Sequence, residues 1–132
     1  MVPSKQLFTI RIALVAGVAI FAGLAAYQRA QGMLPSVSGD STLEMMRYVL
    51  WGLSLAAVFA AIFLKARIEG ATAPGAHVKL TLIGWAFGEG VALFGTAQHF
   101  AGGPIAPMAL GLLTFIVVLI LLPVPRNPQK LD

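Results

Sequence analysis

One apolar run, Leu80 to Ala101, constrains this chain more than any other stretch because it carries a single carboxylate, Glu89, near its centre. A run of about 20 predominantly apolar residues can cross the hydrocarbon core of a membrane as one helix. A charged side chain at the middle of such a helix costs at least ~2.5 kcal/mol when it faces lipid. We therefore predict a membrane-spanning helix in which Glu89 has a partner in protein or a function of its own.

The rest of the chain has the same apolar character. Hydrophobic residues make up 58% of its 132 residues and charged residues 11%, whereas soluble domains carry about 25% charged residues. This composition predicts an all-α, polytopic membrane protein with one integral membrane domain and no separate soluble domain. The domain covers residues 1–132, and its four transmembrane helices, arranged as two hairpins, span about 7–27, 45–64, 80–100 and 105–122.

Polar segments and segments rich in proline and glycine separate the four runs, as expected for loops. His77 falls in the second of these segments, where we expect a solvated side chain. Two long polar loops and one short turn are predicted at Gln28–Glu44, Lys65–Lys79 and Ala101–Pro107. Proline cannot continue a helix, and the residues that close the last helix are Pro123, Pro125 and Pro128.

The basic residues predict the orientation of the helices. Seven Lys or Arg side chains fall on one side of the membrane and two on the other, and Lys and Arg are enriched in cytoplasmic loops. Both termini are therefore predicted to be cytoplasmic, in a multi-pass protein of the bacterial inner membrane. The net charge of +4 then reflects topology, so membrane lipids are expected partners and nucleic acid is not. The larger group is Lys5, Arg11, Lys65, Arg67, Lys79, Arg126 and Lys130, and the smaller is Arg29 and Arg47.

Three polar side chains, Glu89, Ser54 and Thr114, lie at comparable depths in their predicted helices. A protonated Glu89 could donate a hydrogen bond to Ser54 or Thr114, which would satisfy the carboxyl group without a buried charge. Glu89 could instead bind and release protons at the middle of the membrane, as acids do in proton relays. Contact with a neighbouring subunit, a lipid or a pigment is the third interpretation.

Two further ionisable residues lie in the apolar runs. His99 could relay protons or ligate a metal or a haem, or it could be an interfacial histidine without such a role. A bis-histidine haem is excluded within one copy because no second histidine lies inside the predicted spans. Arg11 could extend its guanidinium to the membrane interface or serve as a charge partner for another helix.

Small residues recur at every fourth position in two of the predicted helices. Such faces let two helices approach closely. The predicted packing faces are Gly84, Gly88 and Ala92 in the third span and Gly52, Ala56 and Ala60 in the second. The alternative for the third span is that its glycine-rich face lines a ring or a ligand groove.

No combination of residues points to catalysis. The chain contains no cysteine, which removes disulfides, thiolate metal sites and thiol nucleophiles. We identify no catalytic, cofactor-binding or metal-binding residues and do not predict an enzyme. The sequence is compatible with a bound pigment, quinone or lipid and selects none of them.

Two resemblances add to this reading. The segment Lys65 to Ala101, a basic loop with a proline followed by FGEGVALFGTAQ, resembles the second helix of rotary ATP synthase c subunits, where a carboxylate precedes a small residue and an apolar run. Those subunits have two spans, so we do not interpret this four-span chain as a rotor subunit. The whole chain resembles a group of small, uncharacterised bacterial four-span membrane proteins, which implies no particular activity. The residues that carry this second resemblance are Arg11, Glu89 with the ALFG run at Ala92 to Gly95, and Pro123.

The sequence thus predicts a non-catalytic accessory subunit of a larger membrane complex, of the respiratory or photosynthetic electron-transfer kind. Small-residue faces on which helices can dock, without active-site residues or an extramembrane domain, favour this prediction. Other integral membrane subunits would then be its partners. The alternative is a small proton- or ion-translocating membrane protein that uses Glu89 as its ion-binding group.

Overall fold

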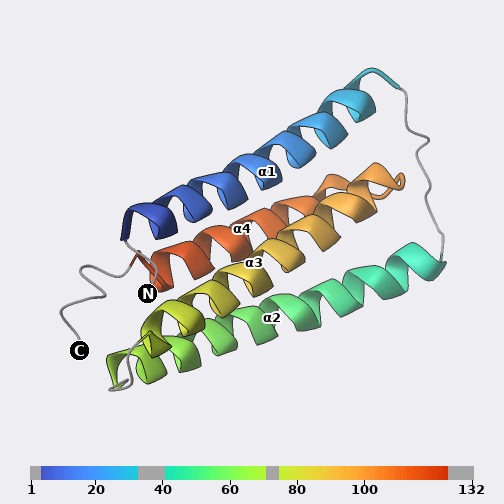
Figure 1. The fold of residues 1–132 in the computed structure, drawn as a ribbon. Coiled ribbons are helices and arrows are strands. Elements are labelled where there is room, and N and C mark those ends of the chain that lie inside the picture. The colour runs from blue at the N-terminus through green and yellow to red at the C-terminus, as the bar shows by residue number, and fades with distance from the viewer. Residues whose placement is uncertain (1–3, 33–40, 71–74, 125–132) are drawn as a thin grey trace.

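The computed structural model describes residues 4–32, 41–70 and 75–124, and this part of the chain is all-helical (Figure 1). Its helices are α1 (Ser4–Ala30), α2 (Ser41–Glu69), α3 (Ala76–Phe100) and α4 (Ile105–Leu121). The prediction of an all-α fold with four helices is confirmed. Residues 33–40 and 71–74 lie outside the described residues, as does the tail that holds Pro125, Arg126, Pro128 and Lys130.

Three of the helices, α1, α2 and α3, are long and apolar enough to cross a membrane. The fourth, α4, is strongly apolar but has 17 residues, which gives it a length of about 26 Å. A hydrocarbon core is about 30 Å thick, so the fourth predicted span is a shorter apolar helix than the others. Length and composition together are those of a membrane protein.

The helices extend further than the predicted spans. Helix α2 continues to Glu69 and α3 begins at Ala76, so most of the predicted Lys65–Lys79 loop is helical. Helix α1 likewise continues to Ala30. The loop prediction is wrong at these ends because hydropathy marks where the apolar segment ends, whereas the backbone hydrogen bonds of a helix continue into polar sequence. Gly75 precedes α3 with φ 75°, a conformation that glycine adopts without strain.

Helix α3 is the centre of the bundle because it packs against all three other helices. Helices α3 and α4 form a close antiparallel hairpin, and α1 and α2 flank it on opposite sides (Figure 1). The first two helices had been expected to pair as a hairpin of their own. They do not pack together as one, because each buries its apolar stripe against the α3–α4 hairpin instead.

Glycines bring α3 and α4 into backbone contact. A Cβ atom on Gly111 of α4 would lie 2.9 Å from the carbonyl oxygen of Val91, and a Cβ atom on Gly95 of α3 would overlap the carbonyl oxygen of Pro107. Such close approach is the typical use of small residues between helices. The largest fully buried side chain, Trp85, lies on α3 in this core.

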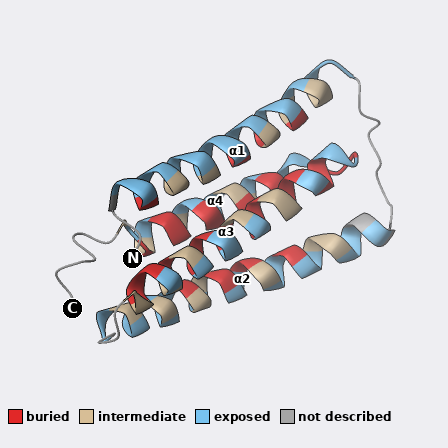
Figure 2. Cartoon of the chain, viewed as in Figure 1, coloured by how far each residue is buried: buried red, intermediate tan, exposed pale blue. Residues whose placement is uncertain are grey.

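The outer helices are much less buried than α3 (Figure 2). Helix α1 buries a narrow stripe with helical spacing, formed by Leu7, Val18, Ala22 and Ala25. Both α1 and α2 turn large apolar side chains outward, such as Ile20 at 71% exposure and Phe59 at 69%. Apolar surface of this extent is covered by lipid or by other proteins.

Candidate functional site

The buried end of α4 is bound by side chains from two other helices. Arg11 of α1 donates a hydrogen bond of 2.9 Å from its guanidinium to the carbonyl oxygen of Leu119, and the indole Nε1 of Trp85 donates one of 2.7 Å to that of Leu122. The Arg11 guanidinium also lies 5.5 Å from the centre of the Trp85 ring. Carbonyl groups in the last turn of a helix lack intrahelical partners. Arg11 and Trp85 therefore cap α4 where Pro123 stops it.

A second arginine of α1 binds the other end of the same hairpin. Arg29 donates hydrogen bonds to the carbonyl oxygens of Gly102 and Gly103, in the turn between α3 and α4. Arg11 and Arg29 are 18 residues apart, which is five helical turns and about 27 Å. They therefore lie on the same face of α1 and fasten it at both ends of the α3–α4 hairpin. We call this pair the arginine clamp.

The arginine clamp changes the interpretation of Arg11. The sequence left open whether this side chain extends to the interface or pairs with a charge on another helix. In the structure it binds another helix, but through a carbonyl oxygen rather than a carboxylate. The reason is local: α4 ends opposite Arg11, and its free carbonyl groups are acceptors that the sequence pattern does not display.

We expect replacement of Arg29 by methionine to loosen α1 from the hairpin, because hydrogen bonds from a charged donor are among the stronger ones in proteins. Since the chain has no cysteine, cysteines introduced at Phe21 and Phe100, whose rings stack with centroids 6.1 Å apart, can report the distance between α1 and α3. Crosslinking by a short bifunctional thiol reagent should slow about tenfold. Arg47→Met, in an exposed pair with Glu44, is the control, and an unchanged rate in Arg29→Met would contradict the clamp.

Glu89 lies on the side of α3 that faces α1. Residues four before and eleven after Glu89 lie on the same side of the helix, within about 40° of it. Of these, Trp85 contacts Arg11 of α1 and Phe100 stacks on Phe21 of α1. The side chain is partly exposed. Within the described ranges no group lies at hydrogen-bond or ion-pair distance from it. Glu89 is thus an unpaired carboxylate halfway along an apolar helix.

The polar residues at the depth of Glu89 do not bond to it. Thr114 donates its hydroxyl hydrogen to the carbonyl oxygen of Leu110 in its own helix, at 2.8 Å. The hydroxyl oxygen of Ser54 is buried and has no hydrogen-bond partner among the described residues. Ser54 lies on α2, which contacts α3 at Gly84 through Leu64. Glu89 follows Gly84 by five residues and therefore points about 140° away from α2.

Both histidines are buried by their neighbours. His99 is 4% exposed, and its Nδ1 lies 3.0 Å from the carbonyl oxygen of Gly103, which joins it to the turn that Arg29 binds. Gln98 donates from its side-chain amide to the carbonyl oxygen of Met46 on α2. His77 is helical and 3% exposed, so the expectation of a solvated loop residue is wrong. His77 belongs to the first turn of α3, and this turn lies inside the helix bundle.

The two predicted small-residue faces have different surroundings. Gly88 lies against Val118 and Phe115 of α4, and Ala92 lies against Gly111 of α4. On α2 the Gly52 position is exposed, with no atom within 4 Å of an added Cβ. Ala56 is exposed and Ala60 is partly exposed. The small-residue face of α3 packs against α4. The small-residue face of α2 is left uncovered by the described residues.

The described part of the chain has few side chains that could ligate a metal ion. No group of three or more His, Asp or Glu side chains there is arranged to hold a metal ion. The fold and these contacts define a class: in its described part this is an all-helical protein with three helices long and apolar enough to cross a membrane. Comparison with models of protein families, with curated proteins and with solved structures finds no match.

Neither the arginine clamp nor the burial of Trp85 was predicted from the sequence. Arg29 fell in the predicted loop Gln28–Glu44, so its spacing of 18 residues from Arg11, which puts both on one face of a helix, became visible only once α1 was seen to reach Ala30. The positive-inside count placed them on opposite sides of the membrane and treated each separately. For Trp85 the sequence held no signal, because its partner is a backbone carbonyl group at the end of another helix.

Proposed function

We propose that this protein is an integral membrane protein that acts as a non-catalytic accessory subunit of a larger membrane complex. The observation that carries the proposal is the unpaired Glu89 on an apolar helix. In lipid a carboxylate without a donor is costly, and the described chain supplies none. A donor from a neighbouring subunit would satisfy it.

The surface around Glu89 suits a second helix. Ala86 and Gly90, on the outward side of α3 beside Glu89, are exposed, and a Cβ atom on Gly90 would meet nothing within 4 Å. Gly17 of α1, one turn before the Phe21 that stacks on α3, is equally open. Small residues on both sides of the carboxylate would let a partner helix approach within hydrogen-bond distance. The uncovered Gly52 face of α2 offers a second contact.

The proposal predicts that the protein migrates with partner subunits after extraction from native membranes in a mild detergent. Native-gel separation and mass spectrometry should find redox or pigment proteins in fixed stoichiometry with it. Gly90→Leu, which fills the open face, should abolish co-migration, whereas Ala109→Leu, on an exposed face of α4, should not. Glu89→Gln should keep the partner because the amide still forms hydrogen bonds, and Glu89→Leu should lose it. Wild-type protein that migrates alone would overturn the proposal.

A second candidate function rests on the same carboxylate. Partial exposure and the lack of an internal partner would leave Glu89 free to exchange protons or ions at mid-membrane. In that case purified protein in liposomes should conduct protons, and Glu89→Gln should abolish the flux. The Glu89→Gln variant distinguishes the two functions, because an accessory subunit should tolerate this substitution and an ion carrier should not.

A further inference from the structure

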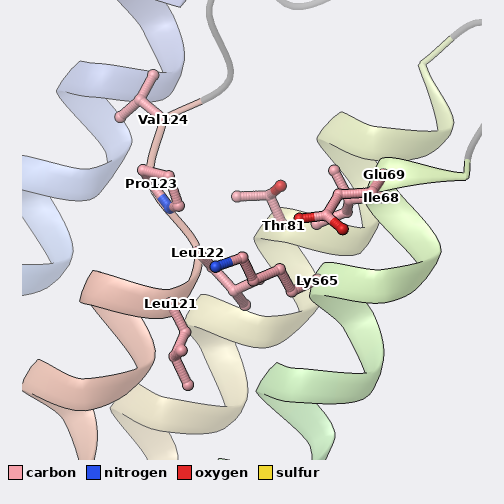
Figure 3. Close-up of a pocket in the computed structure, with 8 residues that line it drawn as sticks. All are labelled: Lys65, Ile68, Glu69, Thr81, Leu121, Leu122, Pro123 and Val124. Carbon is pink, nitrogen blue, oxygen red and sulfur yellow. The ribbon is translucent and has the colours of Figure 1, made fainter.

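A cavity of about 420 Å³ lies between α2 and the end of α4, with the start of α3 as its floor (Figure 3). This volume is within the range of about 300–1,000 Å³ found for small-molecule sites. Most of the lining is apolar, and the end of α4 contributes Leu121, Leu122 and Pro123. The polar exceptions are Lys65 and Glu69 from α2 and Thr81 from α3. We call this the Lys65–Glu69 cavity.

The two charges of the cavity do not neutralise each other. Lys65 and Glu69 are one helical turn apart, and both side chains extend from α2 over the cavity (Figure 3). They are not among the ion pairs formed by the described residues. Lysine before glutamate at this spacing is the less favourable order for a pair on a helix. The cavity therefore presents an ammonium group and a carboxylate that are both available to a ligand.

The Thr81 hydroxyl is restricted to one role towards a ligand. It donates its hydrogen to the carbonyl oxygen of His77 at 2.7 Å, so only its lone pairs remain for the cavity. Together with the Glu69 carboxylate it forms an acceptor pair on one side of the cavity (Figure 3). Such a pair suits a cation that carries N–H donors. Lys65 supplies three N–H donors for an anion.

We propose that the Lys65–Glu69 cavity binds the headgroup of an aminophospholipid. Its phosphate diester would contact the Lys65 ammonium, and its primary ammonium would donate to Glu69 and Thr81. The apolar wall of Leu121, Leu122 and Pro123 would contact the glycerol and the first acyl carbons. The site stands at the end of two long apolar helices, where lipid headgroups lie. The inference rests on the membrane embedding in the proposed function but not on the accessory role.

The acceptor pair also gives selectivity. A choline headgroup has the same phosphate but no N–H donor, so it donates no hydrogen bond to Glu69 or Thr81. A glycerol headgroup has the phosphate but no positive charge for Glu69. Thr81 is buried, and Glu69, which is exposed in the free protein, would be covered by the bound headgroup. An acceptor that a ligand covers and leaves unpaired reduces affinity, which is how a site rejects an analogue that lacks a donor. The cavity should prefer ethanolamine over both.

The test is native mass spectrometry of the purified full chain in detergent with dioleoylphosphatidylethanolamine, dioleoylphosphatidylcholine or dioleoylphosphatidylglycerol. We expect the wild type to bind the ethanolamine lipid about tenfold more tightly than the choline lipid. Glu69→Gln and Thr81→Val should reduce this preference while retaining phosphate binding. Lys65→Met should weaken binding of all three lipids.

Matched controls lie outside the cavity. Glu44→Gln and Lys79→Met remove one negative and one positive exposed charge elsewhere and should leave the lipid preference unchanged. Equal binding of ethanolamine and choline lipids by the wild type would overturn the inference. An ethanolamine preference that survives Glu69→Gln and Thr81→Val together would overturn it as well. Loss of partner subunits has no effect on this measurement, so failure of the accessory role is seen separately.

Discussion

Replacement of Trp85 by alanine is expected to destabilise the fold by about 3–5 kcal/mol, the range for deleting a large buried aromatic side chain. Trp85 is fully buried and joins three helices. It lies on α3, donates to the Leu122 carbonyl oxygen of α4 and packs against the Arg11 guanidinium of α1. Its loss leaves a cavity, an unpaired carbonyl group and an arginine without its ring. The free energy of unfolding in detergent measures the sum.

Two further variants separate these contributions. Trp85→Phe keeps an aromatic ring and removes the N–H donor, so it should cost about 1–3 kcal/mol for the unsatisfied carbonyl group. Trp51→Ala removes the other tryptophan of the chain, which is 52% exposed on α2, and should change stability by roughly 0.5 kcal/mol or less. Equal losses in Trp85→Ala and Trp51→Ala would show that Trp85 does not join the helices as described.

Replacement of Gly95 by alanine is the second large expected effect, about 3 kcal/mol of destabilisation. The added Cβ atom would overlap the carbonyl oxygen of Pro107. Because this neighbour is backbone rather than the end of a flexible side chain, the two helices must move apart, and overpacking of this kind costs about 1–3 kcal/mol or more. Thermal unfolding in detergent gives the change.

The control for Gly95 is the same substitution five residues earlier. Gly90→Ala meets nothing within 4 Å, and alanine is the better helix former by about 0.5–1 kcal/mol. Gly90→Ala should therefore raise the free energy of unfolding while Gly95→Ala lowers it. If Gly90→Ala and Gly95→Ala changed the free energy of unfolding in the same direction, contact with α4 would not decide whether these glycines tolerate substitution.

Glu89, which has no partner among the described residues, shows that depth in the membrane alone does not predict which side chains form hydrogen bonds. Counting residues along each apolar run placed Glu89, Ser54 and Thr114 at one level and suggested a hydrogen bond between them. A shared depth is necessary for such a bond but does not fix the rotation of each helix about its axis. In the structure α3 turns Glu89 towards α1, and Thr114 donates within its own helix.

His77 and Arg11 illustrate the same limit at the helix ends. Each predicted apolar run forms the main part of one helix, yet polar residues near the ends of these runs were expected in loops or at the interface. His77 belongs to the first turn of α3 and is buried. Arg11 caps a neighbouring helix. Residues at the ends of apolar runs are placed by the helices beside them, and the sequence does not display those neighbours.

The sequence by itself determined the existence of four helices and the apolar character that suits three of them to cross a membrane. Both follow from local properties, namely side-chain hydropathy and backbone hydrogen bonds that each segment satisfies internally. The tertiary structure alone decided that α1 and α2 flank the α3–α4 hairpin, that two arginines fasten α1 to it, and that Glu89 has no partner among the described residues. These features depend on which faces meet, and that is set by glycine contacts and free carbonyl groups on separate helices.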